Sequence, residues 1–395
     1  FPATLVLFRM GDFYELFYDD ARKAARLLNI TLTQRGESAG QPVVMAGVPH
    51  HQLDNYLSKL IRMGESAVLV EQVGEVGADK GPVRREVARI VTPGTATDDA
   101  LLDPQASNRL AAITIGEGRY GLAWMELAAG RFAVLETTRA SDFAAEVARV
   151  RPTELLIADD TPETLLAFLG PQPLRRRPPW HFDAARATRS LTEQFGTRDL
   201  RGFGAADLDP ALAAAGALLT YAQETARTQL GHIRGMMVET PSDALLLDPA
   251  TRRNLELDRT LAGEAAPTLA SVLDVTVTHM GSRQLRSWLL RPLRNRAVLR
   301  ARQDAVEELL AGDGDWQAVP RAHALRNALK DSADIERICS RIALRSARPC
   351  SCGWTRCRWR ATIMRRSLET PAAARLRPVA SASAAAVSPC RSAIM

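Results

Sequence analysis

The spacing of the apolar residues changes once along this chain of 395 residues, near residue 245. Before that point, short β-branched and apolar runs alternate with segments of helical spacing, which is typical of mixed α/β domains. After it only helical spacing remains, over residues 251–261, 269–277, 282–290, 297–310 and 335–344. The sequence therefore predicts a multidomain fold, in which α/β domains are followed along the chain by the start of an all-α domain.

Two units are expected inside the α/β part. Pro93-Gly94-Thr95 and the polar residues after it predict a turn and a linker. A second unit begins near Asn108 with a meander of three strands, over residues 110–115, 120–127 and 131–136, and closes near Pro241. We therefore expect domains over residues 1–100, 105–241 and 245–349, with residues 350–395 set apart.

The local pattern of the first unit predicts strands and helices in alternation. Strands are expected over residues 4–9, 29–33, 67–73 and 83–92, and helices over residues 18–28 and 54–63. Residues 41–51 carry several Gly and Pro and predict a loop.

The last segment, residues 350–395, differs in composition from everything before it. It holds eight Arg and one acidic residue, a net charge of +7, so residues 1–349 carry −1 of the chain's total of +6. The sequence pI of about 9.3 therefore comes from this segment and does not indicate a nucleic-acid surface on residues 1–349. We interpret this segment as an aberrant, frameshifted and disordered tail; a genuine basic tail and zinc binding through its cysteines, Cys350, Cys352 and Cys357, are the alternatives.

Composition also excludes several protein classes. The longest run without a charged residue, residues 38–53, has 16 residues and is broken by Gly and Pro, whereas a membrane-spanning helix needs about 20 apolar residues. No secretion leader is visible, and Cys339 is the only cysteine before the tail, which fits a reducing cytoplasm. The chain begins with Phe1 inside a strand-like stretch, so we expect a short preceding piece to be missing.

The most informative motif is Arg9-Met-Gly-Asp-Phe-Tyr-Glu-Leu-Phe-Tyr-Asp-Asp-Ala21. It resembles the opening of the MutS mismatch-repair family, whose Phe-x-Glu motif reads mispaired DNA; Phe13, Tyr14 and Glu15 match that motif. Further blocks follow in the family's order: Thr31-Leu-Thr-Gln-Arg-Gly36, Met45-Ala-Gly-Val-Pro-His50, Asn55-Tyr-Leu57, Glu71-Gln-Val-Gly74, Val91-Thr-Pro-Gly-Thr95, Phe195-Gly-Thr-Arg-Asp-Leu200, Thr251-Arg-Arg-Asn-Leu-Glu256 and Asp334-Ile-Glu-Arg-Ile338. The resemblance covers residues 1–349.

This resemblance implies a fold, a function and partners. The expected fold is a mixed α/β mismatch-recognition domain, a ribonuclease-H-like α/β connector and the start of a helical core. The implied function is binding of mispaired or unpaired bases in post-replicative repair, in a bacterial, nucleoid-associated protein of the cytoplasm. The implied partners are duplex DNA with mismatches or small loops and, for the full-length family, a second copy of the chain and the MutL repair protein.

The residue chemistry supports the same hypothesis. A mispaired duplex is easier to unstack and bend than a matched one, and an apolar aromatic side chain can wedge between its bases from the minor groove. Phe13 supplies such a ring, and Glu15 lies on the same side of an extended segment, where it can hydrogen-bond the displaced base. A carboxylate beside phosphates also penalises matched DNA. The alternative is that Phe13 and Phe17 belong to the core while Glu15 faces solvent.

Further residues are candidates for contacts around this wedge. Basic residues close to it would hold phosphates, and the alternative for each is a solvated turn or strand edge. In the family, the loop after residue 41 flanks the wedge. The candidates are Arg35, Lys80 and Arg84 for phosphates, and Met45, Pro49 and His50 in that loop.

The sequence lacks the motifs expected for ATP binding and for nuclease activity. A Walker A loop needs GxxxxGK[ST], and no lysine of the chain follows a glycine. We therefore expect no enzyme activity and no cofactor here, although the full-length family uses ATP and Mg²⁺. A nuclease needs several carboxylates around a metal ion, and the meander offers only Glu126 and Glu136.

Two other interpretations remain open. The chain could be a truncated product that binds no DNA, or a module that contacts repair proteins through residues 105–240. In that region Leu174-Arg-Arg-Arg-Pro-Pro-Trp180 reads either as a phosphate-binding patch or as a solvated loop with a docking Trp.

Overall fold

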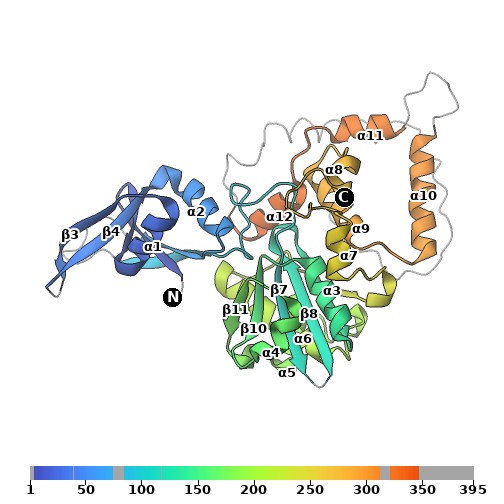
Figure 1. The fold of residues 1–395 in the computed structure, drawn as a ribbon, viewed down its shortest axis with the longest axis horizontal. Coiled ribbons are helices and arrows are strands. Elements are labelled where there is room, and N and C mark those ends of the chain that lie inside the picture. The colour runs from blue at the N-terminus through green and yellow to red at the C-terminus, as the bar shows by residue number, and fades with distance from the viewer. Residues whose placement is uncertain (1–3, 39, 74–83, 117, 312–320, 347–395) are drawn as a thin grey trace. The chain divides into compact units, whose positions relative to one another are not determined.

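The computed structural model describes residues 4–38, 40–73, 84–116, 118–311 and 321–346 (Figure 1). The expected α/β layout is confirmed, with two six-stranded sheets followed by helices. The predicted tail, residues 350–395, lies outside the described residues. No helix within the described ranges is both long and apolar enough to cross a membrane.

Within the described ranges, helices cover only one face of the first sheet. Helix α1 (Tyr18–Leu28) buries Ala21, Ala24 and Leu28, and ends at Asn29, whose left-handed conformation (φ 53°) caps it. Together with α2 (Leu53–Arg62) it packs against the apolar residues of one sheet face. The strand order is β3 (Leu32–Ser38), β4 (Gln41–Pro49), β2 (Phe13–Phe17), β1 (Leu5–Met10), β5 (Ala67–Gln72) and β6 (Arg85–Val91).

The loop predicted over residues 41–51 is wrong. Residues Gln41–Pro49 form β4, which pairs with β2 from Phe13 opposite Pro49 to Phe17 opposite Met45, without a register shift. Alternation explains the strand, because Val44, Ala46 and Val48 are buried towards the helices. The glycine and prolines that suggested a loop lie on the other face or near the strand ends.

The second sheet has helices on both faces. Strands β7, β8 and β9 form the predicted antiparallel meander, and β10, β11 and β12 are added in parallel. Helices α5 and α6 cover one face and α3 the other. The order is β11 (Leu174–Arg177), β10 (Glu154–Ala158), β7 (Leu110–Gly116), β8 (Arg119–Glu126), β9 (Arg131–Thr137) and β12 (Met237–Glu239), with α3 (Ala140–Val150), α4 (Glu163–Leu166), α5 (Ala184–Phe195) and α6 (Asp209–Ala226).

Only helices are described after residue 245, as the sequence predicts. Two of them are shorter than expected, because the spacing continues into turns beyond their last helical residue. They are α7 (Pro249–Asn254), α8 (Leu269–Leu273), α9 (His279–Leu290), α10 (Arg296–Leu310), α11 (Arg321–Leu329) and α12 (Ile335–Ala343).

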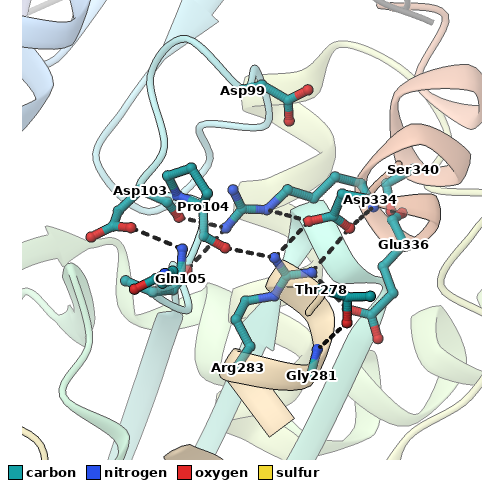
Figure 2. Close-up of polar contacts among 12 residues, drawn as sticks. Asp99, Asp103, Pro104, Gln105, Thr278, Gly281, Arg283, Asp334, Glu336 and Ser340 are labelled. Carbon is teal, nitrogen blue, oxygen red and sulfur yellow. Dashed lines mark hydrogen bonds and ion pairs between the residues drawn. The ribbon is translucent and has the colours of Figure 1, made fainter. Parts of the chain in front are cut away.

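Buried arginines join these helices to the link between the two sheets (Figure 2). Arg283 of α9 donates to both carboxylate oxygens of Asp334, at 2.6 and 3.0 Å, and to the carbonyl of Pro104 at 2.9 Å. Arg337 of α12 donates to the carbonyl of Asp103 at 2.9 Å. Burial alone would raise the pKa of Asp334, but hydrogen bonds from Arg283 and Arg337 lower it below its usual value. Side chains from α9 and α12 thus hold a segment that has no helix or strand of its own.

Candidate nucleic-acid interface

Strand β2 separates its side chains onto the two faces of the first sheet. Tyr14 and Leu16 are buried towards the helices, so Phe13, Glu15 and Phe17 lie on the face that has no helix. This alternation places Phe13 and Glu15 side by side, as predicted from their spacing.

Phe13 stands at one end of the sheet and is 47% exposed. Its strand partners are Met10 in β1 and Pro49 in β4. Gly11, in the left-handed region at φ 58°, makes the tight turn from β1 into β2 possible. The amide of His50 donates to the carbonyl of Asp12 at 2.8 Å, which ties this turn to the end of β4. A large apolar ring is therefore presented to solvent from a well-held turn.

Glu15 is half-buried in apolar surroundings. Its strand partners are Phe8 in β1 and Gly47 in β4, and Phe8 in turn packs against Phe17, with the ring centroids 5.8 Å apart. No residue that the structure describes donates a hydrogen bond to the Glu15 carboxyl group or forms an ion pair with it. Its oxygens are therefore available to a ligand beside the Phe13 ring.

Two of the predicted contact residues are buried. Tyr14 is only 3% exposed, and its hydroxyl donates to Glu71 while Arg9 lies 5.4 Å above its ring. Met45 is 9% exposed and lies opposite Phe17 on the helix-free face. Tyr14 therefore faces the helices, whereas Met45 is covered on the same face as Phe13 and Glu15.

The remaining predicted contact residues differ in where the structure places them. Pro49 is half-buried beside Phe13, and the exposed His50 follows it directly, with its ring stacked 5.9 Å from that of Tyr14. Arg35 is exposed in β3, at the edge of the sheet, two strands from β2. Arg84 is exposed and paired with Glu86 at 2.7 Å. Lys80 lies outside the described residues. The structure thus brings Phe13, Glu15 and Pro49 together, places the His50 ring against Tyr14, and leaves Arg35 apart.

Comparison with models of known protein families identifies the family of this chain. Family models match the chain for MutS domain I over residues 1–100, MutS domain II over residues 108–234 and MutS domain III over residues 250–388. The chain belongs to the MutS family. Membership associates it with mismatch recognition and DNA binding in repair. The third match extends past Pro349, where the sequence resemblance was expected to stop, and the interpretation of residues 350–395 as a frameshifted tail stays a prediction.

The structure adds the surroundings of two further residues of this MutS chain, next to Phe13 and Glu15. Arg85 is exposed, and its Nη2 lies 3.0 Å from Sδ of Met10, the strand partner of Phe13. Gly47 lies directly opposite Glu15. The basic segment from Lys80 to Arg85 was a candidate for phosphate contacts, and the structure shows that Arg85 is the arginine beside Met10.

The arginine-rich segment before Trp180 is a strand rather than a loop, and its arginines have partners inside the domain. Arg175, Arg176 and Arg177 of β11 form ion pairs with Glu154, Glu163 and Glu224 respectively. Arg175 pairs with a buried carboxylate, whereas Arg176 and Arg177 pair near the surface, where an ion pair contributes little to stability. Trp180 is 62% exposed.

The two carboxylates of the meander lie in different surroundings. Glu126 at the end of β8 is buried, and Glu136 of β9 pairs with Arg119 at 3.1 Å. Among the residues that the structure describes, no three His, Cys, Asp or Glu side chains gather where they could hold a metal ion.

Proposed function

We propose that this chain binds mispaired or unpaired bases in duplex DNA, with Phe13 wedged into the minor groove and Glu15 hydrogen-bonded to the displaced base. The observation that carries the proposal is the pairing of an exposed aromatic ring with a carboxyl group that has no described partner, on the helix-free face of the sheet. The two side chains differ in what they contribute.

The ring of Phe13 supplies apolar surface. Burying a side chain of this size contributes about 1.5–3 kcal/mol, and unstacking one base step costs a few kcal/mol. The ring therefore offsets much of that cost only where the base step is already weakened by a mispair. Matched DNA, which stacks better, gives no such net gain.

The carboxylate of Glu15 supplies discrimination. Near phosphates it is repelled, and a hydrogen bond to a displaced base compensates for that repulsion only at a mismatch. Arg85 lies close enough to Met10, the strand partner of Phe13, to oppose part of this repulsion by contacting a phosphate, and the exposed Arg84 and His50 are further proposed phosphate contacts.

The partners and the chemistry follow from the same proposal. DNA with mismatches or small loops is the partner of this chain, and a second copy and MutL belong to the longer proteins of the family. We assign no enzyme activity and no ATP or Mg²⁺ site to these 395 residues, because the sequence has no GxxxxGK[ST] loop. The proposed location is the bacterial cytoplasm, at the nucleoid.

Equilibrium titration of the purified chain on a G·T duplex and on its G·C control tests the proposal. Binding to G·T should be tighter, and Phe13→Ala should remove most of the preference while leaving the salt-dependent nonspecific binding nearly unchanged, since no phosphate contact is lost. If Phe13→Ala keeps the full preference, the wedge assignment is wrong.

The exposed Trp180 favours one alternative, a protein-interaction module in the connector. The same titration separates the two functions, because a module of that kind would bind G·T and G·C duplexes equally or not at all.

A further inference from the structure

Gly47 occupies the interior of a regular strand, where glycine normally weakens pairing. The β2–β4 register runs unbroken through the pair Glu15–Gly47, so the glycine does not mark a bulge. In such a position glycine usually indicates a bend, a bulge or the close approach of a ligand or another backbone.

The backbone of Gly47 does not require glycine. Unlike Gly11 and Gly36, it is not among the residues with positive φ, so its conformation is open to any residue.

Packing inside the chain does not require glycine either. A Cβ at residue 47 would lie 3.6 Å from the carbonyl oxygen of Tyr14 and 3.7 Å from both Cγ of Glu15 and Cδ1 of Phe13, which are ordinary contacts. At Gly121, by contrast, a Cβ would lie only 2.3 Å from the backbone of Pro210. Within the residues that the structure describes, nothing therefore excludes a methyl group at residue 47.

The neighbours of that missing side chain are the two proposed mismatch-reading residues. Any side chain at residue 47 would stand directly against the ring of Phe13 and the stem of Glu15, on the face that has no helix. A base stacked on Phe13 with its polar edge towards Glu15 would lie beside this point of β4.

We propose that Gly47 is a specificity-determining residue, whose missing side chain lets the displaced nucleotide approach the strand between Phe13 and Glu15. The inference rests on the proposed function and deepens it, because it assigns the space that the unstacked base occupies. Enlarging residue 47 should block the mismatched complex and leave the free protein intact.

The test is a titration of Gly47→Ala and Gly47→Val on G·T and G·C duplexes, together with their thermal unfolding. The preference for G·T should fall progressively with side-chain size, by about tenfold for Val, or about 1.4 kcal/mol. Binding to G·C should stay within about twofold, because phosphate contacts are kept. The unfolding midpoint should not fall, because valine suits a strand better than glycine.

Gly116→Val is the matched control. Gly116 ends β7 in the other sheet, has an ordinary φ, and a Cβ there would meet nothing within 4 Å. This variant should leave both titrations unchanged.

Phe13→Ala separates failure of the inference from failure of the proposed function. If Phe13→Ala loses the preference and Gly47→Val keeps it, the inference about Gly47 is overturned and the wedge stands. If Phe13→Ala keeps the preference, the wedge itself is wrong. A lower unfolding midpoint for Gly47→Ala would also overturn the inference, since the glycine would then have an internal role.

Discussion

At the scale of single residues, Glu15 combines a hydrogen-bonding group with a negative charge, and the two can be separated by substitution. Glu15→Ala removes both, so binding to matched DNA should rise and discrimination should fall. Glu15→Gln removes the charge alone, so matched binding should rise similarly while part of the discrimination remains. Titrations on G·T and G·C duplexes at two salt concentrations measure both effects. Weaker matched binding by Glu15→Ala would contradict the assigned repulsion.

Tyr14 lies between Phe13 and Glu15 in the sequence, but its side chain is on the opposite face of the sheet. Tyr14→Phe removes the hydroxyl that donates to Glu71 and keeps the ring that packs in the core. We expect the free energy of unfolding to fall by about 0.5–1.5 kcal/mol, the usual net value of one hydrogen bond, with the preference for G·T unchanged. Urea unfolding and the duplex titration check the two parts. A lost preference in a stably folded Tyr14→Phe would restore Tyr14 as a contact residue.

At the scale of elements, the accuracy of the sequence predictions follows from the strength of each pattern. Helix α1 was predicted at its observed bounds because alanines and a leucine recur at helical spacing. Strand β4 was missed because its helix-free face carries Gly47 and Pro49, which have the composition of a loop. Strand β11 was missed because three arginines are polar in sequence, and their acidic partners lie far along the chain. Long-range pairing of this kind leaves no local signal.

The segment that links the two sheets contains the motif Val91-Thr-Pro-Gly-Thr95, and the structure explains its glycine, Gly94. Glu154 of β10 is buried, and its carboxylate accepts hydrogen bonds from the Thr92 hydroxyl at 2.6 Å, the Gly94 amide at 3.1 Å and the Tyr221 hydroxyl at 2.6 Å. Burial and the adjacent Glu154 raise the pKa of Tyr221 above its usual value. The Thr-Pro-Gly sequence is thus a docked segment rather than a free linker.

Gly94→Ala tests this docking. The added Cβ would lie 2.6 Å from Cδ1 of Leu110 and 3.0 Å from Cβ of Glu154, so the link must shift. We expect a loss of about 1–3 kcal/mol in the free energy of unfolding, as for other overpacked sites. Chemical denaturation measures this loss, with Gly116→Ala as the control in open space. Equal stability of the two variants would show that the link is not held against Glu154.

At the scale of the whole molecule, the excess positive charge and the family motifs lie in different parts of the chain. The positive charge is in residues 350–395, whereas the motifs that resemble the MutS family are in residues 1–349. Residues 1–349 carry a net charge of −1, so net charge gives them little general attraction for DNA, and the proposed recognition depends on the local geometry around Phe13. The sequence was enough to identify the family, because its motifs occur in order over most of the chain. It could not show that Tyr14 is buried or that Gly47 faces Glu15, because both depend on how β2 and β4 pair.

Nucleotide is expected to have no effect on DNA binding by these 395 residues. Tight binding of ATP phosphates in this family's manner needs a glycine-rich loop that ends in Gly-Lys, because the loop amides and the lysine neutralise the phosphates. The chain has four lysines, Lys23, Lys59, Lys80 and Lys330, and none follows a glycine. Titration on the G·T duplex with and without ATP and Mg²⁺ should therefore give the same affinity, and phosphate release should equal the buffer blank. Stoichiometric ATP binding in a calorimeter would contradict this, and it would require a phosphate site of a kind that the sequence does not indicate.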